Sequence, residues 1–168
     1  QYNEAAYLIS NAYAHFPDYS WHIILVNLFD QPNPRCLLAF HEGHYFACPD
    51  NGLLPMIFNG DPQHAVVLPL APAAVPNMMA WIDKIAEAII AIENGGSFQQ
   101  LGSEAENMIL KSNLQPNFFD DYIEGRIIFI DRFENVIVNI TRQLFETVRK
   151  GRSFRIEFKT DDVITKIS

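Results

Sequence analysis

The chain has 168 residues and a formal net charge of −8, because 20 acidic side chains outnumber 12 Lys and Arg. This excess repels phosphate backbones and anionic lipids, so we expect no nucleic-acid partner and no membrane partner. Hydrophobic residues make up 49% and charged residues 19% of the chain, which is typical of a globular protein with its own core. The two cysteines lack metal or redox spacing, which favours a reduced, cytoplasmic setting and no metal.

The first part of the chain predicts a helix followed by strands. Apolar residues recur at helical spacing over residues 3–16, and Pro17 ends this helix. The nearly continuous apolar run 21–29 predicts a strand buried on both faces. Segments 36–40 and 44–48 predict two short strands joined by a tight hairpin. A helix followed by a buried strand favours a mostly parallel sheet with crossover helices.

Later segments complete this α/β domain and begin another. Residues 65–70 predict a strand, and a Pro-rich segment leads into an amphipathic helix over about 77–93. Residues 103–124 are mixed and polar, and we expect them to connect two domains, 1–102 and 125–168. The short apolar or alternating segments of the second domain are typical of antiparallel β-structure.

Two motifs are better explained by structure than by chemistry. His41 and His44 have an H-x-x-H spacing, but side chains three apart in an extended segment point to opposite faces. We therefore favour turn histidines over metal ligands. Cys48 has no His or acidic partner suggested by position, so a small buried apolar residue is favoured over a nucleophile.

Two segments stand out, 49–54 (PDNGLL) and 130–140 (IDRFENVIVNI). We expect the first to be a structural turn near the site and the second to contribute ligand contacts. If the second is extended, Asp131, Phe133 and Asn135 share one face and present a carboxylate, an aromatic ring and an amide. These groups suit a nucleoside, which offers hydroxyl and amino groups and a flat base. An ordinary strand and turn is the alternative.

The order of these segments resembles the S-adenosyl-L-methionine (SAM) hydrolase family, also called SAM hydroxide adenosyltransferases, which is related to the fluorinase and chlorinase enzymes. GHYFACPDNGLL in the middle and IDRFENVIVNI later carry the resemblance, together with EAAYLISNAYAHFP and FQQLG. The resemblance implies a divergent member that lacks the family's first strand–helix unit and the last part of its second domain.

This resemblance also implies a fold and an activity. The fold is α/β, with a Rossmann-like N-terminal domain and part of a smaller C-terminal β-barrel domain. The family forms homotrimers whose adenosyl pockets lie between subunits. Its hydrolases need no cofactor besides the substrate SAM, because water or hydroxide displaces methionine from C5′ and leaves adenosine. Asp131, Phe133 and Asn135 match the family's D-x-F-G-N, with Glu134 in place of its Gly.

The chain departs from the family pattern at the catalytic positions. Asn27 stands where the D-P-G-V-G loop begins with a carboxylate, and Arg35 lies at or one step beyond the family's Arg. Ala80 stands where the T-F-H-G-R-D segment has its His. An amide is no base, so Asp30 is the candidate substitute for the missing acid. The predicted catalytic set is therefore Asn27, Asp30 and Arg35.

Three functions remain open at this point. The chain hydrolyses SAM with a rearranged catalytic set, or it binds SAM or adenosine without turnover, or it is an oligomeric scaffold that has lost the ligand. Hydrolysis leads, because the segment order and the nucleoside motif are retained.

Overall fold

The computed structural model describes residues 2–70, 77–111, 114–158 and 163–164. The Pro-rich segment before the long helix lies outside the described residues. The chain divides into two compact units, unit 1 over Gln1–Asn113 and unit 2 over Leu114–Ser168. Each is described separately.

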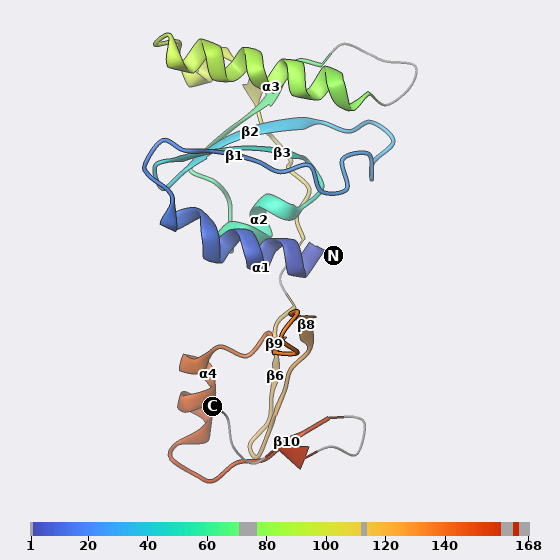
Figure 1. Ribbon diagram of the computed structural model, residues 1–168, viewed down its shortest axis with the longest axis vertical. Helices are drawn as coiled ribbons and strands as arrows, with labels where there is room; N and C mark the ends of the chain where they lie inside the picture. Colours follow the sequence, from blue (N-terminus) through green and yellow to red (C-terminus); the bar gives the residue numbers. More distant parts are fainter. Residues whose placement is uncertain (1, 71–76, 112–113, 159–162, 165–168) are drawn as a thin grey trace. The chain divides into compact units, whose positions relative to one another are not determined.

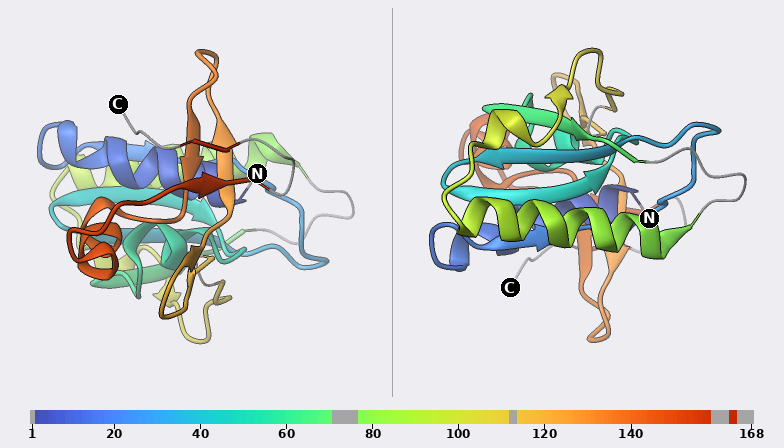
Figure 2. Two further views of the ribbon diagram at one scale, coloured as in Figure 1. Left: turned by 90° about the horizontal axis from the view of Figure 1, so that it is seen from below. Right: turned by 90° about the horizontal axis from the view of Figure 1, so that it is seen from above.

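Unit 1 has three layers. Its sheet has the strand order β1-β3-β2-β4-β5, with helices α1 and α2 on one face and α3 on the other (Figure 1). Seen from above in the right-hand view of Figure 2, α3 runs in front of the strands. The elements are α1 (Tyr2–Ala12), η1 (Tyr13–His15), β1 (Trp21–Ile23), β2 (Cys36–His41), β3 (His44–Pro49), α2 (Leu53–Phe58), β4 (His64–Leu68), α3 (Met78–Glu93), η2 (Phe98–Gln100) and β5 (Ser103–Glu104).

The sheet is mixed, and only part of it agrees with the expected parallel arrangement. β1 pairs with β3 in parallel, whereas the β2–β3, β2–β4 and β4–β5 pairings are antiparallel. The reason is the predicted hairpin: Glu42 and Gly43 turn the chain directly from β2 into β3, and both adopt positive φ, which Gly accepts without strain. The predicted helix and strand near residues 77–93 and 65–70 are confirmed as α3 and β4.

Both faces of the sheet carry a hydrophobic core. Phe46, fully buried, lies in the core beneath α1 and α2, and Trp81 and Ile85 of α3 close the other core. Helix α3 begins where the Asn77 side chain accepts a hydrogen bond from Met79 N (2.9 Å), as an N-cap residue does. Cys36 and Cys48 are both buried, and burial raises the pKa of the Cys48 thiol, which confirms it as an apolar packing residue.

The predicted strand 21–29 is mostly a loop. Only Trp21–Ile23 pairs as a strand, and the chain then turns, with Asn27 at φ 50°. The apolar run reflects packing on both sides of the sheet, because Ile24 enters the core beneath α1 and Leu28 enters the core beneath α3. A buried loop and a buried strand therefore give the same sequence pattern here.

The histidine pair is also arranged differently from the prediction. His41 and His44 are direct cross-strand partners, so the hairpin brings their side chains to the same face rather than to opposite faces. His41 stacks on Phe58, and His44 lies 3.2 Å from His22 of β1 between ring nitrogens. Within the described ranges, no group of three or more His, Cys, Asp or Glu side chains could hold a metal ion.

The histidine cluster is expected to make unit 1 sensitive to mild acid. Burial, and then the neighbouring His44, lower the pKa of His22 below its usual 6.5. The unfolded chain therefore binds more protons below about pH 6.5, and stability falls as the pH falls. We expect the unfolding temperature to decrease between about pH 7.5 and pH 5, and His22→Phe, which keeps the stacking on Phe46, to flatten this dependence. An unchanged slope in His22→Phe would contradict the assignment.

Unit 2 consists of paired strands and one helix. Its elements are β6 (Asn117–Phe118), β7 (Ile123–Glu124), β8 (Ile127–Ile130), β9 (Val136–Val138), α4 (Arg142–Arg149), β10 (Ile156–Glu157) and β11 (Val163–Ile164). The strands pair antiparallel in three separate two-stranded sheets, so antiparallel β-structure is confirmed and a barrel remains a prediction. Helix α4, which begins after the N-cap Thr141, was not predicted from the sequence.

Candidate functional site

The candidate site of unit 1 lies at one edge of the sheet. β1 and β3 are parallel neighbours, so their carboxyl ends meet at the same edge, where α/β proteins commonly bind ligands. The loop 24–35 follows β1, and the Asp50-Asn51-Gly52 turn follows β3. The segment after β5, residues 105–111, reaches the same edge, because Ile109 and Lys111 contact these two loops. The expected connecting segment 103–124 therefore begins within unit 1.

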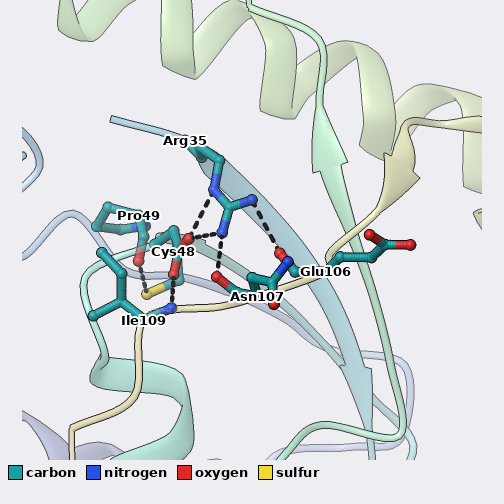
Figure 3. A network of polar contacts seen from close by, with 7 residues as sticks. Arg35, Cys48, Pro49, Glu106, Asn107 and Ile109 are labelled. Carbon is teal, nitrogen blue, oxygen red and sulfur yellow. Dashed lines mark hydrogen bonds and ion pairs between the residues drawn. The ribbon is translucent and has the colours of Figure 1, made fainter. Parts of the chain in front are cut away.

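An ion pair organises this edge (Figure 3). The Arg35 guanidinium donates from Nε (2.8 Å) and Nη2 to the Asp50 carboxylate, whose side chain is only 3% exposed. Its Nη1 donates to Glu106 O (3.1 Å), and Nη2 also donates to Asn107 O (3.0 Å). The other Asp50 oxygen accepts from Ile109 N (2.8 Å). Arg35 and Asp50 thus fasten the chain after β5 to the ends of β2 and β3.

Asn51 fixes the loop that contains the predicted catalytic residues. Its side chain is 1% exposed and donates from Nδ2 to Val26 O (2.8 Å) and Asn27 O (3.4 Å). Its Oδ1 accepts from Leu53 N (3.2 Å) at the start of α2. Gly52 follows at φ 88°, and an added Cβ would meet the Lys111 side chain at 2.5 Å, so this turn requires glycine.

Asp30 also has structural partners. Its carboxylate accepts a hydrogen bond from the Tyr2 hydroxyl (2.7 Å) and pairs with Lys111 Nζ at 3.7 Å. Lys111 Nζ lies over the Tyr2 ring, 3.5 Å from its centroid. Asp30 nevertheless remains partly exposed, with 42% of its side chain accessible to solvent.

A surface cavity of about 270 Å³ opens beside the ion pair. It is lined by Gln31, Pro32, Asn33, Arg35, Asp50 and Ile109. A guanidinium, a carboxylate and two amides therefore face one cavity, which suits a polar ligand. The ring of Phe29 contacts Trp81 at 6.3 Å between centroids, so the same loop touches the first turn of α3, where Ala80 lies.

The predicted catalytic residues are thus on one loop, although only Arg35 lines the cavity. Asn27 sits in a left-handed turn whose carbonyl also accepts from Asp30 N (3.2 Å). Sequence reasoning treated PDNGLL as a structural turn near the site and did not predict that Asp50 lines the cavity. The signal was a carboxylate placed directly after a buried strand, at the edge where the Arg35 loop also begins.

The predicted nucleoside motif of unit 2 is a turn rather than an extended strand. The Asp131 carboxylate accepts hydrogen bonds from Asn135 Nδ2 (2.8 Å), Asn135 N (2.9 Å) and Phe133 N (2.8 Å). The Asn135 side chain, followed by the backbone bonds, holds the pKa of Asp131 below its usual value. The turn reverses the chain from β8 to β9 and leaves the Phe133 ring 82% exposed. The motif therefore offers an exposed ring beside a braced Asp–Asn pair.

Glu134, which replaces the family's Gly, occupies φ 66° in this turn. A residue with a Cβ is strained there, so we expect Glu134→Gly to stabilise unit 2 by about 1 kcal/mol, and Glu134→Ala to give no such gain. Hydrogen exchange of the β8 and β9 amides is the suitable measurement, because both Trp residues lie in unit 1. Equal protection in wild type and Glu134→Gly would show that the turn carries no strain.

The chain combines an α/β unit, with a polar cavity at the carboxyl edge of its sheet, and a smaller antiparallel β-rich unit. This defines a two-unit α/β protein. The chain belongs to the SAM hydroxide adenosyltransferase family: residues 1–102 match its N-terminal domain and residues 125–167 its C-terminal domain. The resemblance seen in the sequence is confirmed. A search of the curated proteins finds no match.

Solved structures share the fold. A conserved protein from Thermotoga maritima is 15% identical, with a TM-score of 0.68 over 92% of this chain. A conserved hypothetical protein from Thermus thermophilus is 22% identical, with a TM-score of 0.57 over 83% of this chain. The chain spans 61% and 55% of these two proteins. In the part of the chain that the structure describes, no helix is long and apolar enough to cross a membrane.

Proposed function

We propose that this chain binds SAM and transfers its adenosyl group to water, which releases adenosine and methionine. Family membership over both domains supports SAM as the ligand. The observation that carries the proposal is the position of Arg35, at or beside the family's Arg, in a polar cavity at the carboxyl ends of β1 and β3. We also expect a homotrimer, in which a neighbouring subunit completes the adenosyl pocket.

The chemistry needs positioning more than activation. The water oxygen forms a bond to C5′ while the C5′–S bond breaks, and its electron pair remains on the sulfur of methionine. Because the sulfonium is already a good leaving group, no metal or further cofactor is needed. The proton lost from water passes to a base, for which Asp30 is the partly exposed carboxylate on the loop. Asn27, on the same loop but outside the cavity lining, is the amide proposed to orient the water, and Arg35 forms part of the cavity wall.

The exposed ring of Phe133, with Asp131 and Asn135, is proposed to contact the nucleoside. An aromatic face stacks on the adenine, and the Asp–Asn pair offers hydrogen-bonding groups beside it. Both the hydrolase and a silent relative require this contact.

Binding without turnover is the second candidate, and the contacts of Arg35 favour it. All three guanidinium nitrogens already donate to Asp50 or to backbone carbonyls, so none is wholly reserved for a nucleophile. Asn27 and Ala80 also replace a carboxylate and a His, which removes two groups that could hold or deprotonate water. A chain that has lost the groups that hold and deprotonate water could no longer hydrolyse SAM. It would still have the pocket and would act as a SAM sensor.

A chromatographic assay with SAM separates the candidates. Hydrolysis predicts adenosine and methionine above the enzyme-free rate, and the double variant Asn27→Asp with Ala80→His, which restores the family's side chains, should be faster still. Intact SAM with a raised unfolding temperature supports the silent relative, because a ligand that binds only the folded state stabilises it. If the folded protein gives no product and no thermal shift, SAM is not its ligand. The remaining candidate is then the oligomeric scaffold.

A further inference from the structure

A row of ring side chains crosses four neighbouring strands of unit 1, far from Arg35. Trp21 of β1 lies directly opposite Tyr45 of β3. Tyr45 lies opposite Phe40 of β2, and Phe40 lies opposite His64 of β4. Direct partners point to the same face of a sheet, so the four rings form one continuous row. The row spans on the order of 14 Å, since neighbouring strands lie about 4.8 Å apart.

Tyr45, the second ring of this row, is fixed in place by a stacked neighbour. Tyr45 stacks on Trp21 with centroids 4.4 Å apart and 17° between the planes. Trp21 is fixed in turn by a hydrogen bond from its Nε1 to Glu93 Oε1 (3.4 Å). Tyr45 also faces Phe98 of η2, nearly parallel at 25° but with centroids 6.4 Å apart. The wider spacing leaves the Tyr45–Phe98 pair less tightly stacked than the Trp21–Tyr45 pair.

A cavity of about 210 Å³ lies at this looser pair. It is lined by Phe40, Tyr45, His64, Phe98 and Gln99. The Gln99 Oε1 accepts a hydrogen bond from Ser97 Oγ (2.8 Å), which leaves its Nε2 amide group to donate to a ligand. Phe98 follows Gly95 and Gly96, two residues without side chains that connect η2 to α3. The cavity is therefore lined by the aromatic rings of Phe40, Tyr45 and Phe98 and by the polar side chains of His64 and Gln99.

Charge restricts what this cavity accepts. Unit 1 contains 11 Asp and Glu and only three Lys or Arg, which are Arg35, Lys84 and Lys111. None of these three lines the cavity, and the Glu93 carboxylate lies beside the row at Trp21. An anionic ligand is repelled here, whereas a cationic ring is attracted both by the carboxylates and by the aromatic faces.

We infer that the Tyr45–Phe98 cavity is a second binding site, for a small planar heteroaromatic ring that is neutral or positively charged. The ring stacks on Tyr45 and Phe98, and its edge receives a hydrogen bond from Gln99. The site is distinct from the cavity beside Arg35, because Phe40 and Cys36 lie at opposite ends of β2, roughly 13 Å apart along the strand.

Titration of the full chain with 1-methylnicotinamide, followed by amide chemical shifts in NMR, tests this site. We expect saturable shifts at Tyr45, His64, Phe98 and Gln99, and roughly tenfold weaker binding of the anionic ring nicotinate. Cyclohexanecarboxamide, which has an amide on a nonplanar ring, should cause no saturable shift. The titration is done without SAM, so its outcome is independent of the proposed function.

Two variants assign the shifts to the cavity. Phe98→Leu keeps apolar bulk and removes the ring, so it should abolish binding, while Phe118→Leu, at an exposed ring of unit 2, should leave it intact. Gln99→Ala, a change at an exposed side chain, should weaken binding severalfold. Equal binding of cyclohexanecarboxamide, full binding by Phe98→Leu, or absence of saturable shifts would each overturn the inference.

Discussion

Replacing Arg35 with Ala is expected to lower the free energy of unfolding of unit 1 by about 3 kcal/mol. The change leaves the nearly buried Asp50 carboxylate without its ion-pair partner and frees Glu106 O and Asn107 O. An unpaired buried charge costs more than the pair itself contributes. Urea unfolding followed by Trp fluorescence reports on unit 1 directly, because Trp21 and Trp81 both lie there.

Two controls separate this structural role from catalysis. Arg35→Lys keeps the positive charge and loses the forked geometry, so it should recover only part of the stability. Asp50→Asn should be less harmful than Arg35→Ala, because the guanidinium side chain it leaves behind is 37% exposed and can be hydrated. If Arg35→Ala is as stable as wild type and only turnover is lost, Arg35 acts on the substrate and the ion pair is dispensable. A simple loss of activity in Arg35→Ala therefore does not identify a catalytic residue.

Replacing Asn51 with Asp is expected to cost about 3 kcal/mol, although the two side chains have the same shape. The substitution turns the Nδ2 donor into a carboxylate oxygen that faces Val26 O and Asn27 O in a fully buried position. Asn51→Ala removes the same bonds without adding charge, so about 2 kcal/mol is expected. The same urea experiment measures both.

The Asn51 variants also test how the loop is held. Hydrogen exchange of the Asp30 amide, which donates to Asn27 O, should become faster in Asn51→Asp and in Asn51→Ala. An Asn51→Asp protein with wild-type stability and exchange would mean that the turn after β3 does not anchor the 24–35 loop.

Periodicity and turn residues predicted the regular elements well. The helical spacing that ends at Pro17 and the run before Gly95 gave α1 and α3, and two strands with a short connection gave the β2–β3 hairpin. The prediction of a strand over 21–29 was wrong for most of its length. Ile24 and Leu28 belong to a loop, and their side chains are buried in the two different cores. The histidine argument failed for a related reason: spacing along the chain does not describe two residues on opposite sides of a turn.

The site was predicted only in part, because its contacts join distant segments. The Arg35 loop was named from the sequence, whereas its partners Asp50, Glu106 and Asn107 come from the turn after β3 and from the segment after β5. No local sequence pattern predicts contacts between residues that are separated by 15 or by 71 positions in the chain. In the Asp131 turn, by contrast, the proximity of Asp131 and Asn135 was predicted correctly. The prediction assumed an extended strand, whereas the two residues lie in a turn.

Calorimetric titration of the folded full chain with SAM tests most directly whether the cavity beside Arg35 belongs to an adenosyl site. We predict saturable binding of SAM by the wild-type chain. Asn33→Trp, which fills the cavity, should abolish this binding. Phe98→Leu, at the other cavity, should leave it unchanged. No heat of binding from a folded protein, or undiminished binding by Asn33→Trp, would contradict the placement of SAM at this edge of the sheet.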